Sequence, residues 1–108
     1  MDNHKNDKFY RDKIIENLHF IADHMSGTSY EDFAEDEVLQ DSMMFRLVQI
    51  SENAKDLSNE YKENHKAVPW NQIYGLRNRL VHDYGNVDLS IVYDTLTKDI
   101  PGLLKAME

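Results

Sequence analysis

A long stretch without glycine or proline, residues 36–63, constrains the fold of this chain more than any other part of the sequence. Apolar side chains recur along it at the spacing of three and four residues that places them on one face of an α-helix. They are Val38, Leu39, Met43, Leu47, Ile50, Ala54, Leu57 and Tyr61. The pattern predicts a single helix that would be roughly 40 Å long. Because a compact domain of this size does not need so long a helix, we expect it to pack against a second copy in a dimer.

The segment before this stretch predicts a shorter helix over residues 7–25, whose apolar positions also share one face. Asp7 stands where an N-cap is expected, and Gly27 lies just past the expected end. Ser29 and Asp32 resemble a capping box, which predicts one short helical turn before the long helix starts near residue 35 or 36.

Two further helical patterns follow the long stretch. Pro69 fits the first position of a helix that Gly85 would end. Asp88 is placed to cap another helix, which Pro101 would kink or restart before a last apolar turn. No segment shows the alternation typical of strands. We therefore expect one all-α domain over residues 1–108, a mostly antiparallel bundle of four to five helices that dimerises through the long helix and the helix after Pro69.

The composition excludes several classes of protein. The chain has no cysteine, so it has no disulfide framework and no thiolate metal site. It has no apolar run near the roughly 20 residues that span a bilayer, and its first residues are polar, so we expect a soluble cytoplasmic protein. A net charge of −8 argues against a general nucleic-acid coat, because phosphate binding usually leaves a basic surface.

The residues best suited to chemistry lie close together in the segment Arg77-Asn78-Arg79-Leu80-Val81-His82-Asp83-Tyr84. Asn78 and Arg79 precede His82 by four and three residues, so all three share one side of a helix. The Cα of Arg77 points about 140° away from that of His82. Arg77 therefore reaches over the helix end or acts together with His82 of a second subunit. Tyr84 follows at the helix end, beside the imidazole.

This segment has a functional and a structural interpretation. An arginine binds phosphate oxygens through two parallel hydrogen bonds, and a histidine near neutral pH acts as general acid or base. Together they suffice for RNA cleavage by the ribose 2′-OH without a cofactor or a metal, with the cation stabilising the charge that develops on the phosphoryl group. The alternative is a helix C-terminus whose basic residues favour the helix dipole. On spacing alone, both interpretations stay open.

Glu52 lies beside the apolar stripe of the long helix. It is either a solvated charge or an inward-facing carboxylate that pairs with an arginine elsewhere, because a buried charge needs a partner.

Several separated motifs resemble the HEPN superfamily, and within it the HepT-like toxins, over roughly residues 8–105. The Arg-x4-His-x-Tyr motif of that branch matches Arg77 to Tyr84, and Asn78 fits the polar residue that often follows the arginine. The segments that also match are Val68-Pro69-Trp70-Asn71-Gln72-Ile73, Ile50-Ser51-Glu52-Asn53-Ala54, Val87-Asp88-Leu89 and Asp99-Ile100-Pro101-Gly102-Leu103. Ser51 and Asn53 depart from the Ile-Gly-Glu-Ala-Ala pattern of the family.

The resemblance implies a helical dimer in which two motif helices face a shared cleft. It implies a metal-independent endoribonuclease with Arg77 and His82 as catalytic residues and with Asn78, Arg79 and Glu52 in support. It also implies a type VII-like toxin–antitoxin pair, in which a minimal nucleotidyltransferase neutralises the toxin by transferring AMP to Tyr84. AMP there would add negative charge and bulk where RNA phosphate must dock.

A second function remains open at this point. The chain could be a non-catalytic subunit that presents a nucleotide or a substrate to a nucleotidyltransferase. The net charge of −8 also means that RNA binding would depend on a local positive cleft, such as Arg77 and Arg79 of two subunits would form. Such binding should depend steeply on salt and could favour a structured substrate such as tRNA.

Overall fold

The computed structural model describes residues 3–82 and 84–108, and the side chains of residues 6–82 and 85–108. The described part is helical and contains no strand, which confirms the all-α class. The elements are α1 (Asn3–Met25), α2 (Tyr30–Glu35), α3 (Glu37–Lys55), α4 (Asn59–Asn64), α5 (Trp70–His82), the 3₁₀ turn η1 (Tyr84–Asn86), α6 (Leu89–Asp94), the π-helical segment η2 (Thr95–Asp99) and α7 (Ile100–Met107).

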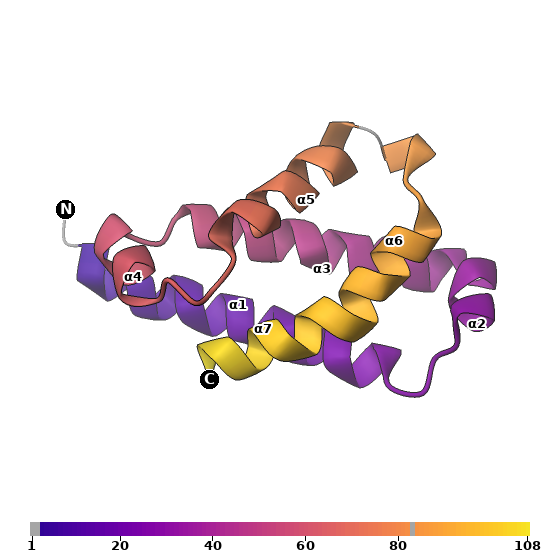
Figure 1. The fold of residues 1–108 in the computed structure, drawn as a ribbon, viewed down its shortest axis with the longest axis horizontal. Helices are drawn as coiled ribbons and strands as arrows, with labels where there is room; N and C mark the ends of the chain where they lie inside the picture. The colour runs from indigo at the N-terminus through magenta and orange to yellow at the C-terminus, as the bar shows by residue number, and fades with distance from the viewer. Residues whose placement is uncertain (1–2, 83) are drawn as a thin grey trace.

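The helices form a mostly antiparallel bundle, as the sequence predicts. Helix α3 runs antiparallel to α1, and α5 turns back along α3 on its other side (Figure 1). Helices α6 and α7 continue each other through η2 and bring the end of the chain back against α1. The molecule measures 45 × 28 × 21 Å, so it is elongated along α1 and α3.

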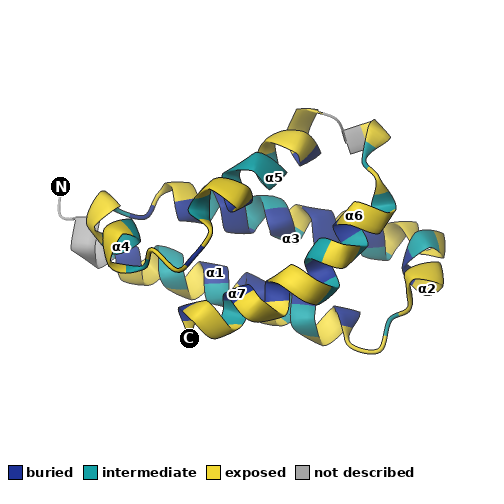
Figure 2. Ribbon diagram, viewed as in Figure 1, coloured by how far each residue is buried: buried dark blue, intermediate teal, exposed yellow. Residues whose placement is uncertain are grey.

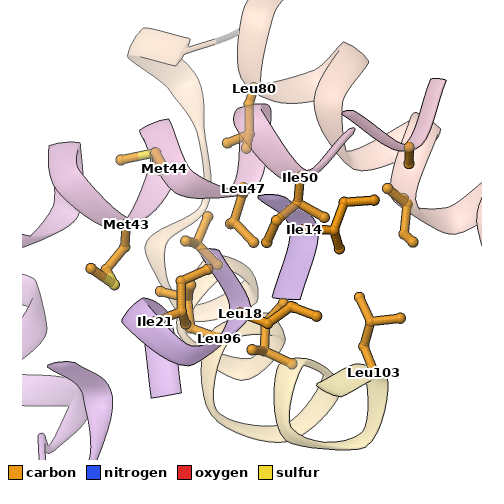
Figure 3. Close-up of a cluster of buried hydrophobic side chains, with 14 of the residues drawn as sticks. Ile14, Leu18, Ile21, Met43, Met44, Leu47, Ile50, Leu80, Leu96 and Leu103 are labelled. Carbon is orange, nitrogen blue, oxygen red and sulfur yellow. The ribbon is translucent and has the colours of Figure 1, made fainter. Parts of the chain in front are cut away.

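The core lies between α1, α3 and the rod of α6, η2 and α7. Buried residues line the inner faces of these helices, and exposed residues line their outer faces (Figure 2). Figure 3 shows Ile14, Leu18 and Ile21 of α1 facing Leu47 of α3 and Leu96 of η2. Because protein interiors are close-packed, this arrangement fixes how the two long helices face each other. It thereby fixes the surface on which α5 rests.

The start signals read from the sequence act as expected at three helices. The side chains of Ser29, Asp36 and Asp88 accept hydrogen bonds from backbone N–H groups in the first turns of α2, α3 and α6. At Asp88, hydrogen bonds from the hydroxyl and backbone N–H of Ser90 hold the pKa of the carboxyl below its ordinary value. Gly27 follows α1 with a φ of 75°, a conformation that favours glycine at a helix end.

The prediction of one helix over residues 36–63 is wrong. Helix α3 ends at Lys55, and α4 begins at Asn59 after a break that still buries Leu57. Ser58 caps α4 by accepting a hydrogen bond from the backbone N–H of Tyr61 at 3.1 Å. Its own backbone N–H and its hydroxyl donate to the carboxylate of Asp7 at 2.8 and 2.6 Å. These bonds stabilise the break.

The predicted ends of two other helices also need correction. Helix α1 starts at Asn3, so Asp7 is a buried residue within it and not its cap, because its carboxylate binds Ser58. Helix α5 starts at Trp70, directly after Pro69, whose carbonyl accepts from the backbone N–H of Ile73. It ends at His82, and Gly85 lies beyond it in η1.

Pro101 neither breaks nor restarts the chain, because the five residues of η2 form a π-helical turn that leads directly into α7. A proline has no backbone N–H, and its ring clashes with the carbonyl of the preceding turn in a regular helix. The wider π turn relieves that clash and keeps the helix continuous.

Candidate functional site

Helix α5 carries the motif and packs mainly on α3. Two hydrogen bonds join the helices. The buried hydroxyl of Ser51 donates to the carbonyl oxygen of Ile73 at 2.8 Å, and the phenol of Tyr74 donates to that of Ala54 at 3.3 Å. Because both bonds involve the first half of α5, that half is held against α3. Its second half, which ends at His82, extends beyond them.

Arg77 and Glu52 form an ion pair between α5 and α3. The Nε of Arg77 donates to the Oε1 of Glu52 at 2.7 Å, and the two side chains are 33% and 40% exposed. This confirms the interpretation of Glu52 as a carboxylate that pairs with an arginine. A second, longer bond of 3.4 Å joins Nη1 of Arg77 to Oδ1 of Asn78. The pair fixes the guanidinium while leaving part of it open to solvent.

His82 is exposed at the end of α5, and within the described part of the chain it makes no hydrogen bond or ion pair. It lies four residues after Asn78 and eight after Tyr74, so the three residues follow one another along one side of α5. The side chain of Tyr84 lies outside the described residues, although its backbone belongs to η1.

Arg79 is separated from Arg77. It lines an apolar groove of about 390 Å³ between α5 and the η2–α7 rod, together with residues such as Leu47, Ile73 and Leu76. Arg77 and Asn78 line a different pocket on the other side of the helix. Within one protomer, therefore, the two arginines do not form one positive cleft.

The pocket beside Arg77 contains residues that the sequence reasoning missed. It has a volume of about 340 Å³ and is lined by Ser51, Glu52, Lys55, Lys62, Tyr74, Arg77 and Asn78. Lys55 ends α3, whereas Lys62 lies on α4 with its Nζ 5.4 Å from the centre of the Tyr74 ring. No spacing rule relates these lysines to the motif, because the break before α4 brings them to it.

The described residues contain no group of three histidine, aspartate or glutamate side chains placed to hold a metal ion. Nor is any helix in the described ranges both long and apolar enough to cross a bilayer. What the site offers is an arginine held by a carboxylate, an exposed imidazole farther along the same helix, and two lysines. These groups suit acid–base chemistry on a phosphate ester.

Comparisons with known proteins agree with this chemistry. The family model described as Ribonuclease HepT-like matches residues 6–108. A protein of Caldanaerobacter subterraneus subsp. tengcongensis, named as a candidate RNase, is 36% identical over 99 residues, which cover 92% of this chain and 88% of that protein. A protein of Thermococcus cleftensis, named for the ribonuclease HepT, is 31% identical over 96 residues, with 89% and 87% covered. No solved structure matches the chain.

The family model thus spans nearly the whole chain, including the residues of the motif. Both relatives exceed 30% identity and are covered over most of their length. The chain therefore belongs to the HepT-like ribonuclease family of the HEPN superfamily.

Proposed function

We propose that this protein is a metal-independent endoribonuclease and the toxin of a type VII-like toxin–antitoxin pair. The observation that carries the proposal is the Arg77–Glu52 ion pair, because it fixes a partly open guanidinium on the helix that ends at His82. Membership of a ribonuclease family supports the same reaction. RNA, with tRNA as the first candidate, is the proposed substrate.

In the proposed reaction His82 accepts the proton of a ribose 2′-OH, and the 2′-oxygen attacks the adjacent phosphorus. The bond from phosphorus to the 5′-oxygen of the next nucleotide breaks, and that oxygen takes up a proton. The products are a 2′,3′-cyclic phosphate and a free 5′-OH. Arg77 stabilises the negative charge on the phosphoryl oxygens, Glu52 and Asn78 orient it, and Arg79 adds positive charge nearby.

We propose that the active form is a homodimer in which two motif helices face each other. The apolar groove beside α5 and the exposed side chains of Val81 and Ile91 support this assembly, because both leave apolar surface near the motif without a cover in the monomer. In the dimer, Arg79 of each subunit would add to the positive charge around the scissile phosphate.

The test of the enzyme is cleavage of total tRNA in EDTA and low salt by the wild type and by His82→Ala. We expect cleavage only by the wild type, with 2′,3′-cyclic phosphate ends, and a loss of at least a hundredfold in the variant. His19→Ala is the matched control, because His19 is also an exposed helical histidine but lies on α1. Size-exclusion chromatography and circular dichroism verify that assembly and fold survive. Equal cleavage by wild type and His82→Ala would refute the assignment.

We further propose that a partner nucleotidyltransferase neutralises the protein by transferring AMP to Tyr84. Co-expression with such a partner should raise the intact mass by whole AMP units, and Tyr84→Phe should abolish the increase. Tyr30→Phe, at an exposed tyrosine on α2, should leave the increase unchanged. AMP on the Tyr84→Phe protein would place the modification elsewhere.

A second candidate function is a non-catalytic subunit that presents a nucleotide to that partner enzyme. The pocket of about 340 Å³ beside Arg77 supports it, because this volume suits a mononucleotide and His82 is not among its lining residues. No cleavage by unmodified wild-type protein, with nucleotide binding retained, would favour this alternative.

A further inference from the structure

Two lysines stand at the pocket beside Arg77, and no acidic side chain in the described part of the chain pairs with either. Lys55 is exposed at the end of α3. Lys62 is half-buried on α4, and its ammonium group lies over the ring of Tyr74. A cation held over an aromatic ring keeps its charge while it loses freedom of movement, so Lys62 is positioned before any ligand arrives.

The charges in this pocket do not cancel. Glu52 is its one acidic lining residue, and Glu52 already pairs with Arg77. The charges of Lys55 and Lys62 therefore remain uncompensated, on a chain whose net charge is −8. A local excess of positive charge on an acidic protein attracts an anion to that place and to few others.

The pocket also lies in line with His82. Tyr74, Asn78 and His82 follow one another at intervals of four residues along α5. At a rise of 1.5 Å per residue, Tyr74 lies about 12 Å from His82 along the helix axis. Figure 1 shows α4, which carries Lys62, near the beginning of α5, with the end of α5 pointing away from it. A strand bound at His82 and continuing along this side of α5 therefore reaches the lysines.

We propose that Lys55 and Lys62 bind a backbone phosphate of single-stranded RNA that flanks the scissile phosphate, with Tyr74 positioning Lys62. The inference rests on the proposed function for the direction of the strand, and it adds a substrate contact that lies outside the motif. The two lysines hold the strand and take no part in proton transfer. Their loss should therefore weaken binding and raise KM, with kcat unchanged.

The experiment measures binding of a short, labelled, 2′-O-methylated oligoribonucleotide, which cannot be cleaved, to wild type and to the double variant Lys55→Gln/Lys62→Gln. We expect the dissociation constant at low salt to rise about tenfold. We also expect the plot of log Kd against log salt concentration to become less steep by about 1.4, or about 0.7 for each lost phosphate contact on a single strand.

The matched control is Lys66→Gln/Lys98→Gln, which removes the same charge at two exposed lysines that pair with Glu63 and Asp94 away from the pocket. If both double variants weaken binding equally, the effect is general electrostatics and the proposal is overturned. Failure of the wild type to bind the oligonucleotide also overturns it.

Two further measurements separate the possible outcomes. Labelled ATP tests the other source of phosphate, and a variant that loses ATP but keeps the oligonucleotide would reassign the pocket to a mononucleotide. Binding by His82→Ala separates this inference from the proposed reaction. Lysine-dependent binding in a protein that cleaves nothing would refute the ribonuclease and leave the RNA contact intact. Cleavage with an unchanged KM in Lys55→Gln/Lys62→Gln would do the reverse.

Discussion

Tyr61 carries a buried hydroxyl group that has no hydrogen-bond partner in the described part of the molecule. Its ring stacks on His65 and contacts the edge of Trp70, so the apolar body of the side chain is well packed while its polar atom is unsatisfied. Burial raises the pKa of this phenol above its ordinary value, although the nearby positive charge of Arg11 opposes the shift. The hydroxyl therefore costs stability.

Tyr61→Phe should leave the free energy of unfolding unchanged or raise it, by up to about 1 kcal/mol at neutral pH, because it removes an unsatisfied polar atom. In the wild type the unfolded chain releases the phenolic proton at a lower pH than the folded chain. Stability should therefore fall as the pH rises above about 10, and Tyr61→Phe should lack this part of the alkaline loss. Urea unfolding at neutral and alkaline pH measures both effects. A clear loss of stability at neutral pH would mean that the hydroxyl is hydrogen-bonded.

Helices α3 and α5 act as one unit at the level of elements. The Ser51–Ile73 hydrogen bond and the Arg77–Glu52 ion pair both cross between these helices. The first is buried and sets the distance between the helices, whereas the second is partly exposed and fixes the guanidinium. A change in the first should therefore disturb the second.

Ser51→Ala should lower the free energy of unfolding by about 1 kcal/mol, the usual net value of such a hydrogen bond. It should also reduce RNA cleavage, because α5 would no longer hold Arg77 in its position over α3. Ser42→Ala is the control, since Ser42 lies on α3 and has no hydrogen-bonding side-chain partner in the described part of the chain. Chemical denaturation and initial cleavage rates measure the two effects. Equal behaviour of the two variants would show that the bond does not position the helix.

The sequence predicts those helix boundaries that depend on neighbouring residues. The caps at Ser29, Asp36 and Asp88 are local, because each side chain binds a backbone N–H two or three residues ahead. The break before α4 is different, since its partner Asp7 stands 51 residues before Ser58 in the chain. A periodic apolar pattern continues through such a break, so periodicity alone predicted one long helix.

The whole molecule separates its charges in space. Its acidic residues outnumber its basic ones, 20 to 12, yet two uncompensated lysines meet a paired arginine at one pocket. The sequence predicted Arg77, Glu52 and the all-α class, because a motif and a stripe are contiguous. It could not predict Lys55 and Lys62 at the site, because their approach depends on how α3, α4 and α5 fold together. The separation of Arg79 from Arg77 likewise follows from the direction of each side chain.

The π-helical segment also has a consequence for how the length of this chain can change. Val92, Leu96 and Ile100 are all buried at successive intervals of four residues. In a regular α-helix two such intervals overshoot two full turns by about 80°, and the wider turn at Thr95–Asp99 absorbs this excess. Removing one residue between Leu96 and Ile100 would leave an interval of three, which an α-helix also places on one face. The rod can therefore lose an amino acid here, as after a one-codon deletion, and keep its buried side in phase.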